Sequence, residues 1–203
     1  MDELTTLYTE IRERMAEDIQ SSELLGGPGQ IVEVDEAKFG KRKFNRGRIA
    51  DGSWVCGGIE CRTNKCSVAM CPANIRNQGT LLRIIQRYVA PGTTVITDKW
   101  KGYTNLGNHG YVHLDVNYSQ NFVDPLTEAH TNSIEGMWTR VKNRVLRRGE
   151  RRTPDSLDAD LTNFMWLRQQ TSHLDGTNRH CSSLESFLSC LISYTLFNET
   201  GYM

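Results

Sequence analysis

The chain has 203 residues, of which 38% are hydrophobic and 24% charged, and its 24 basic and 24 acidic residues give a net charge of zero. This composition excludes a disordered chain, which combines low hydrophobicity with high net charge, and the length predicts one domain, with or without an appended piece. No apolar run approaches the roughly 18 residues of a membrane span, and the acidic N-terminus lacks the order of a signal peptide. We therefore expect a soluble intracellular protein with no membrane partner.

The neutral total hides a segregation of charge along the chain. Residues 34–50 carry six bases and two acids, and residues 136–152 carry seven bases and one acid. Residues 1–33 carry eight acids and two bases, so the first basic cluster follows an acidic segment. Basic clusters of this kind attract polyanions, although two solvated basic faces would give the same pattern.

The first part of the chain predicts a helix followed by strands. Apolar residues at helical spacing predict a helix over residues 4–19, and a linker rich in Gly and Pro follows it. The β-branched run at residues 31–35 predicts a short buried strand that Asp35 closes. Residues 54–71 predict two strands of a hairpin.

Four of the six cysteines recur at every fifth residue of this hairpin, and they are Cys56, Cys61, Cys66 and Cys71. The absence of a C-x-x-C pair argues against a zinc ribbon or finger. A turn over residues 62–65 would place Cys61 opposite Cys66 and Cys56 opposite Cys71. Because side chains alternate along a strand, Cys56 and Cys61 fall on opposite faces, and the four cannot converge on one ion. We interpret them as small buried residues.

The second part of the chain alternates helices and strands. The predicted helices span residues 77–89, 99–106, 132–148 and 184–192, with one more beginning near Pro154, and the predicted strands span residues 93–98 and 111–116. Together with the first part, this order predicts a mixed α/β fold around one sheet.

Three acids stand out by their position in these elements. Asp35 and Asp98 are each expected at the end of a strand, and Glu135 lies in the first turn of the basic helix. Acids placed in this way can converge at one edge of a sheet, where cations have to neutralise their repulsion. Hard divalent ions such as Mg²⁺ prefer oxygen ligands, and two of them roughly 4 Å apart can promote cleavage of a phosphodiester. Each acid alone also has an ordinary explanation, as a turn former or a partner of the helix dipole.

Three motifs, taken in order, resemble a known family. The first is Ile-Val-Glu-Val-Asp-Glu at residues 31–36, the second spans residues 91–103, and the third joins residues 122–125 to residues 130–138. They resemble the catalytic blocks of the Merlin superfamily of transposases and of its bacterial insertion-sequence relatives. The resemblance covers about residues 30–170 and implies a DDE transposase with an α/β, RNase H-like mixed sheet flanked by helices.

The resemblance also implies roles for individual residues. It makes Asp35, Asp98 and Glu135 the catalytic and metal-binding triad, holding two ions of Mg²⁺ or Mn²⁺. Glu33 lies on the same strand face as Asp35 and is a candidate decoy, whereas Glu36 points to the other face.

Other polar residues near these motifs are expected to serve DNA. His130 and Asn132 precede Glu135 and either position substrate or water or cap the helix. In the helix over residues 132–148, an apolar stripe leaves the basic residues to face solvent, where they either grip phosphates or merely keep the helix soluble. The expected DNA-binding residues are Lys41, Arg42, Lys43, Arg140, Lys142, Arg144, Arg147 and Arg148.

We divide the chain into an N-terminal helix and linker at 1–29, a catalytic domain at 30–170 and a C-terminal helical extension at 171–203. Bacterial relatives usually carry a zinc-ribbon or helix-turn-helix region before the catalytic domain, and residues 1–29 contain no zinc ligand set. A domesticated or truncated transposase-derived protein that binds DNA without catalysis is therefore an alternative. Another RNase H-like nuclease is a weaker one.

The expected function is metal-dependent DNA strand cleavage and strand transfer. The expected partners are the DNA of element ends and of the target, with a homodimer as one option. The amino-acid sequence of the third motif is closer to that of eukaryotic Merlin-type proteins, which favours a nuclear location. A bacterial protein would act in the cytoplasm.

Overall fold

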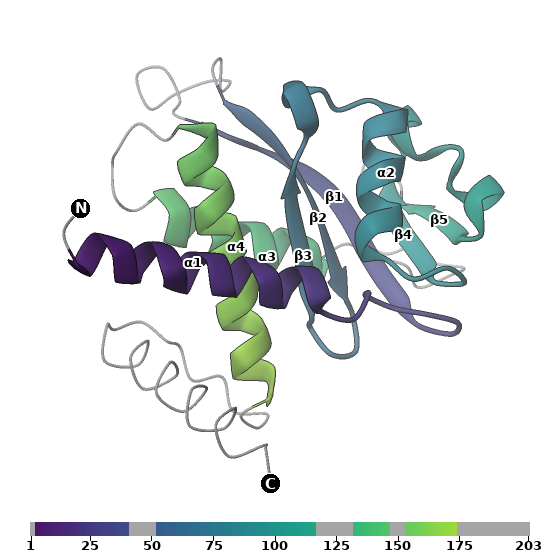
Figure 1. Ribbon diagram of the computed structural model, residues 1–203. Coiled ribbons are helices and arrows are strands. Elements are labelled where there is room, and N and C mark those ends of the chain that lie inside the picture. The colour runs from purple at the N-terminus through teal and green to yellow at the C-terminus, as the bar shows by residue number, and fades with distance from the viewer. Residues whose placement is uncertain (1–2, 41–51, 117–131, 147–152, 174–203) are drawn as a thin grey trace, which may run out of the picture.

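The computed structural model describes residues 3–40, 52–116, 132–146 and 153–173 (Figure 1). The helices are α1 (Glu3–Ser21), α2 (Gln78–Tyr88), α3 (Asn132–Leu146) and α4 (Pro154–His173). The strands are β1 (Ile31–Phe39), β2 (Ser53–Glu60), β3 (Cys66–Met70), β4 (Thr94–Asp98) and β5 (Val112–Val116). Short 3₁₀ turns are η2 (Pro72–Asn74), η3 (Lys101–Tyr103) and η4 (Leu106–His109).

The strands form one mixed sheet in the order β3-β2-β1-β4-β5. β1, β2 and β3 are antiparallel neighbours, whereas β4 runs parallel to β1 and β5 runs parallel to β4. A parallel pair needs a crossover connection, and α2 lies in the connection between β3 and β4. These strand directions and this order are those of an RNase H-like fold, so the predicted mixed sheet flanked by helices is confirmed.

Alternation along β1 divides the core into two layers. Ala37 and Phe39 pack with α1, α3 and α4, whereas Val32 and Val34 pack with α2. Figure 1 shows α2 on one side of the sheet and the other three helices on the opposite side. We call the two sides of the sheet the α3 face and the α2 face.

The N-terminal helix belongs to the core of the α3 face. Met15 and Ile19 of α1 are buried in one cluster with Leu161 and Trp166 of α4. The indole Nε1 of Trp166 donates a hydrogen bond of 2.9 Å to the Asp18 carboxylate, which fixes the crossing of α1 over α4. α1 therefore completes the apolar layer that covers this side of the sheet.

The strand β1 is longer than the sequence predicts. It continues past Asp35 to Phe39, which pairs with Ser53 of β2, so the prediction that Asp35 closes the strand is wrong. The physical reason is that Ala37 and Phe39 keep every second side chain buried on the α3 face. Asp35 consequently lies in the middle of a strand, where it pairs with Gly57 of β2.

The hairpin of β2 and β3 is turned one residue earlier than predicted. Ile59 pairs with Cys66 and Cys56 pairs with Ala69, so the predicted cysteine pairs are wrong. Asn64 adopts a left-handed φ of 58° and its N–H bonds to the Glu60 carbonyl, which closes the turn. Cys56 nevertheless lies in the core of the α2 face and Cys61 contacts a side chain of the α3 face, so the predicted separation of these two cysteines is confirmed.

The remaining elements follow the predicted order. The helix expected over residues 99–106 is replaced by two short 3₁₀ turns, and the helix expected over residues 184–192 lies outside the described residues. Within the described ranges, no helix combines the length and apolarity that a membrane crossing requires.

Candidate active site

Asp35 and Asp98 lie side by side on neighbouring parallel strands. The pairing of β1 with β4 ends at Glu33 and Ile96, and each aspartate follows two residues later on its own strand. Two residues along a strand return to the same face, so both carboxylates project toward the α3 face. Glu135 is exposed in the first turn of α3, the helix that packs on this face.

The Asp35 carboxyl group experiences the charges of the other two acids. Burial is the largest cause that raises its pKa above the usual value, and the carboxylates of Asp98 and Glu135 raise the pKa further. A backbone hydrogen bond at Glu36 and the indole of Trp138 act in the opposite direction. The charges of the other two predicted acids therefore both act on Asp35.

Trp138 fixes the orientation of Asp35. Its indole Nε1 donates a hydrogen bond of 3.0 Å to Asp35 Oδ2, and its ring meets the Phe39 ring edge-on at 5.9 Å. The indole also covers Gly57, the residue of β2 that pairs with Asp35. A Cβ atom at Gly57 would lie 2.7 Å from the Trp138 ring, so glycine lets α3 approach the sheet closely.

Glu33 holds the beginning of α3. Its side chain is fully buried, and its Oε2 accepts a hydrogen bond of 2.9 Å from the backbone N–H of Ile134. Its Oε1 accepts a weaker bond of 3.4 Å from the Cys61 thiol. The sequence offers His130 and Asn132 as capping residues or as residues that position substrate or water, and it does not predict this contact. Its only signal is an acid two residues from Asp35 on the same face.

Glu36 occupies the α2 face, as predicted, and is paired there. Its side chain is 2% exposed, and it accepts bonds of 3.1 Å from the Arg76 guanidinium and 2.6 Å from the Tyr103 hydroxyl. Burial raises the pKa of Glu36 to about 6, against the lowering effect of Tyr103 and Arg76. Sequence analysis assigned no role to Arg76 or Tyr103.

Arg76 connects this pair to the second acid motif. Its guanidinium stacks between the rings of Trp54, at 4.1 Å, and Trp100, at 4.5 Å. The backbone N–H of Trp100 in turn donates a bond of 3.0 Å to Asp98 Oδ1. We call Glu36, Arg76, Tyr103, Trp54 and Trp100 the α2-face cluster; it supports the end of β4 from behind.

The helix α3 buries the predicted apolar stripe. Its members, all at most 4% exposed, are Ile134, Trp138, Val141 and Val145. Asn132, Arg140 and Arg144 are exposed, and Lys142 is half-buried with its ammonium 5.9 Å from the centre of the Phe39 ring. The other predicted residues lie outside the described ranges: Lys41, Arg42, Lys43, His130, Arg147 and Arg148.

The three acids have the donor chemistry of a divalent cation site. In the part of the chain that the structure describes, no Lys or Arg forms an ion pair with Asp35, Asp98 or Glu135. Within the same ranges, no three His, Cys, Asp or Glu side chains are close enough, as they stand, to hold one ion. Carboxylates are nevertheless the oxygen ligands that Mg²⁺ prefers, and the repulsion felt by Asp35 is what a cation would relieve. In residue type and electrostatics the set fits such an ion.

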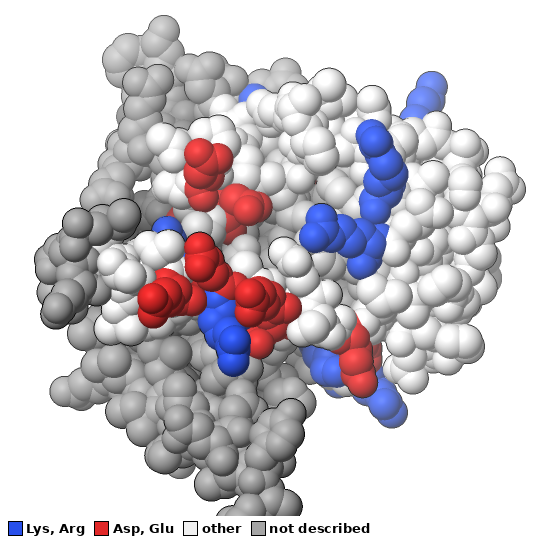
Figure 2. All heavy atoms as spheres, in the orientation of Figure 1, with Lys and Arg blue, Asp and Glu red and all other residues white. Residues whose placement is uncertain are grey.

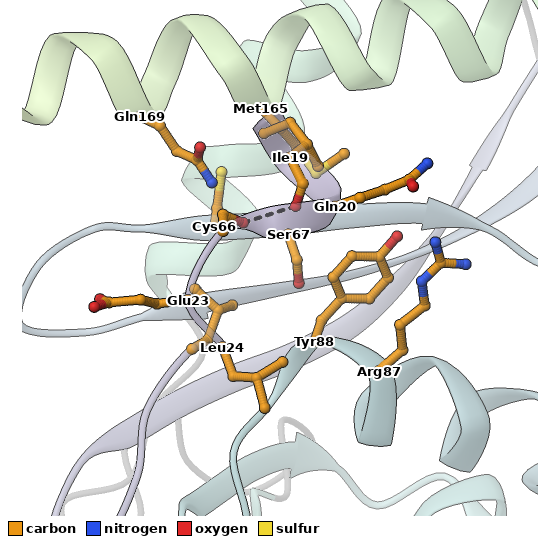
Figure 3. A pocket seen from close by; sticks show the side chains of 12 residues that line it. Ile19, Gln20, Glu23, Leu24, Cys66, Ser67, Arg87, Tyr88, Met165 and Gln169 are labelled. Carbon is orange, nitrogen blue, oxygen red and sulfur yellow. Dashed lines mark hydrogen bonds between the residues drawn. The ribbon is translucent and has the colours of Figure 1, made fainter. Parts of the chain in front are cut away.

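Two other surface features do not belong to this site. A cavity between the ends of α1, α2 and α4 is lined by Cys66, Tyr88 and Met165 among others, and by none of the three acids (Figure 3). The face in Figure 2 shows acidic side chains gathered over α1 and basic side chains over α2. Neither feature contributes a group to the acid site.

Comparison with known proteins places this geometry in context. Residues 24–149 match the family of the ISXO2-like transposase domain. No curated protein matches the chain in sequence.

Several solved structures resemble the chain at low identity. The HTLV-2 integrase catalytic core domain, in complex with magnesium in a trimeric form, is 14% identical with a TM-score of 0.48, covering 77% of this chain and 93% of that one. The catalytic core domain of BIV integrase is 14% identical with a TM-score of 0.46, covering 83% and 97%. The simian T-cell lymphotropic virus intasome in complex with PP2A regulatory subunit B56 gamma is 14% identical with a TM-score of 0.47. The match covers 78% of this chain and 54% of that one.

Proposed function

The chain belongs to the family of the ISXO2-like transposase domain, and from this premise we propose that it is a DDE-type transposase that cuts and joins DNA. The observations that carry the proposal are the register that sets Asp35 and Asp98 on neighbouring strands, and the charges of Asp98 and Glu135 that both act on Asp35. Among the described residues, no Lys or Arg is paired to these three acids. In the proposed reaction, water cleaves a phosphodiester at an element end, and the released 3′-hydroxyl then attacks target DNA.

The three acids would hold Mg²⁺ or Mn²⁺, as two ions, which supply activation of the attacking oxygen and stabilisation of the leaving oxygen. The chain itself supplies position. Trp138 holds one oxygen of Asp35, and the backbone N–H of Trp100 holds one oxygen of Asp98. These contacts fix the direction of each carboxylate.

The DNA would approach along the exposed side of α3. Arg140 and Arg144 are exposed on the helix that begins at Glu135, so they would contact phosphates that lead away from the acids. α1 is unsuited to this role because its exposed acids, Glu10, Glu13 and Glu17, would repel a phosphate backbone (Figure 2).

The test is a strand cleavage and joining assay with Mg²⁺ or Mn²⁺ on DNA carrying the element ends. Asp35→Ala and Asp98→Ala should each lower the rate roughly a thousandfold, because each removes several kcal/mol of transition-state stabilisation. Asp115→Ala is the matched control, because Asp115 is an exposed acid of the neighbouring strand β5 that pairs with Thr97. Undiminished activity of the Asp35 and Asp98 variants would overturn the assignment.

The same assay separates the other candidate functions. A protein that binds DNA with strong salt dependence but cuts no substrate would be a transposase-derived DNA-binding protein. Cleavage without strand-transfer products would instead indicate another RNase H-like nuclease.

Three finer expectations complete the proposal. The wording of the third motif supports a Merlin-type protein, which would act in the nucleus; a tagged protein confined to the cytoplasm during interphase would contradict this. Two copies of the chain would act on the two ends of an element, so we expect a homodimer on DNA, detectable as a doubled mass in light scattering.

A further inference from the structure

We propose that Glu33 is a positioning residue whose buried carboxylate fixes the first turn of α3, and with it Glu135, relative to Asp35. The inference rests on the proposed function, because it assigns Glu33 to the support of a metal-binding acid. It also gives a role to Glu33, which the sequence marks only as a candidate decoy beside Asp35.

The geometry connects two parts of the site that are far apart in sequence. Glu33 lies on β1 two residues before Asp35, and its Oε2 accepts the backbone N–H of Ile134, 101 residues away, at 2.9 Å. Ile134 is fully buried and immediately precedes Glu135. The same strand therefore carries one acid of the site and holds the backbone beside another.

Burial makes this contact specific. The first N–H groups of a helix have no partner within the helix, and leaving one unpaired in the core is costly. A carboxylate at this end also interacts favourably with the helix dipole. Glu33 and Ile134 are both 0% exposed, so bulk water does not reach this contact.

The second oxygen of Glu33 is occupied by a donor that stays protonated. Cys61 Sγ lies 3.4 Å from Glu33 Oε1. Burial, followed by the charge of Glu33, raises the pKa of Cys61 to about 12, so the thiol donates rather than competes as a thiolate. Both oxygens of Glu33 are thus directed at fixed protein groups.

The chain offers a matched control in Glu60. Glu60 is 7% exposed on β2, and its carboxylate accepts a hydrogen bond of 3.1 Å from the backbone N–H of Gly26. Glu60 pairs with Val32 across the sheet, so its side chain lies on the α2 face, away from α3. Its replacement removes a buried carboxylate of the same kind without touching Glu135.

The experiment compares Glu33→Ala and Glu33→Gln with Glu60→Ala and Glu60→Gln in the full chain. Calorimetric titration with Mn²⁺ should show affinity reduced about tenfold to a hundredfold in Glu33→Ala, the range for loss of a group that orients a ligand. Glu33→Gln keeps one acceptor oxygen, so it should recover part of the affinity. Both Glu60 variants should bind Mn²⁺ as the wild type does, whatever their loss of thermal stability.

Hydrogen exchange of the Ile134 and Glu135 amides gives a readout that needs neither metal nor activity. Exchange at these amides should be faster in both Glu33 variants than in the Glu60 variants, by about threefold to thirtyfold, as expected for loss of a charge at a helix N-terminus. Equal exchange and equal Mn²⁺ affinity in the Glu33 and Glu60 variants would overturn the positioning role. Should Glu33→Ala fail to fold, the Gln pair decides by the same two measurements.

The two readouts also separate this inference from the proposed function. If the wild type binds no Mn²⁺ while the Glu33 variants alone show faster exchange, the metal-dependent function fails and the hold of Glu33 on α3 stands. If the wild type binds Mn²⁺ and the Glu33 variants match the Glu60 variants, the function stands and the positioning role fails.

Discussion

The acids on the two faces of β1 have opposite electrostatic surroundings. On the α2 face, Glu36 is matched by Arg76 and by the Tyr103 hydroxyl within 3.1 Å. On the α3 face, Asp35 has an indole N–H at 3.0 Å and the charges of two further acids as its neighbours. Among the described residues, Glu36 therefore has a basic partner, whereas its neighbour Asp35 has none.

This difference teaches which acids are structural and which await a ligand. The charge of a buried carboxylate beside an arginine is matched within the protein, although burial still favours the protonated form of Glu36. Carboxylates that face each other repel, so they cost stability until a cation binds. We therefore assign the α3 face to chemistry and the α2-face cluster to support.

The largest effect on stability is expected at Gly57, where α3 packs on the sheet. Gly57→Ala places a methyl group 2.7 Å from the Trp138 ring and 2.9 Å from Met137, so it should lower the free energy of unfolding by about 1–3 kcal/mol. Urea denaturation measures this loss. Gly58→Ala is the control on the other face, where the nearest atom, Ser67 Oγ, is 3.3 Å away. Equal stability of the two variants would show that Trp138 does not need this close approach.

Glu36 on the α2 face should make the free energy of unfolding depend on pH. The pKa of Glu36 is raised from 4.5 to about 6, mainly by burial, so the folded state holds its proton more tightly than the unfolded state. The stability from this group is full below pH 4.5 and is lost as the pH rises through about 6, a change of about 2 kcal/mol. In metal-free protein, Glu36→Gln should flatten the fall in unfolding free energy between pH 4.5 and 7 by that amount. A fall as steep as that of the wild type would contradict the shift.

A smaller effect is expected from the exposed side of α3. Arg140→Ala and Arg144→Ala should each weaken binding to duplex DNA of any sequence and reduce the slope of the salt dependence by roughly one for each phosphate that is no longer neutralised. Arg14→Ala is the control, because Arg14 is 71% exposed on the acidic helix α1. Binding isotherms at several salt concentrations provide the slope. Arginine variants of α3 that match Arg14→Ala would remove this helix from the DNA path.

Local patterns in the sequence predict much of this site. The β-branched run before Asp98 and the apolar stripe after Glu135 place these acids correctly at a strand end and in a first helical turn. For Asp35 they predict the correct face but a false strand end. Beyond it, the polar Glu36 and Lys38 interrupt the apolar run although alternation continues.

The supporting contacts could not be predicted in this way because they join distant segments. Gly57 is a glycine because of Trp138 on α3, and Glu33 is buried because Ile134 needs an acceptor. Arg76 is 40 residues from Glu36. Each of these contacts forms only when the helices pack on the sheet. The local periodicity of the sequence therefore cannot predict it.

The most direct test of the contrast between the two faces is calorimetric titration of the metal-free protein with Mn²⁺. The wild type should bind the ion, Asp35→Asn and Asp98→Asn should lose this binding, and Glu36→Gln, one residue away on the opposite face, should retain it. Binding that survives in both Asp variants, or a wild type that binds no Mn²⁺, would contradict the assignment of the α3 face as the metal-dependent active site.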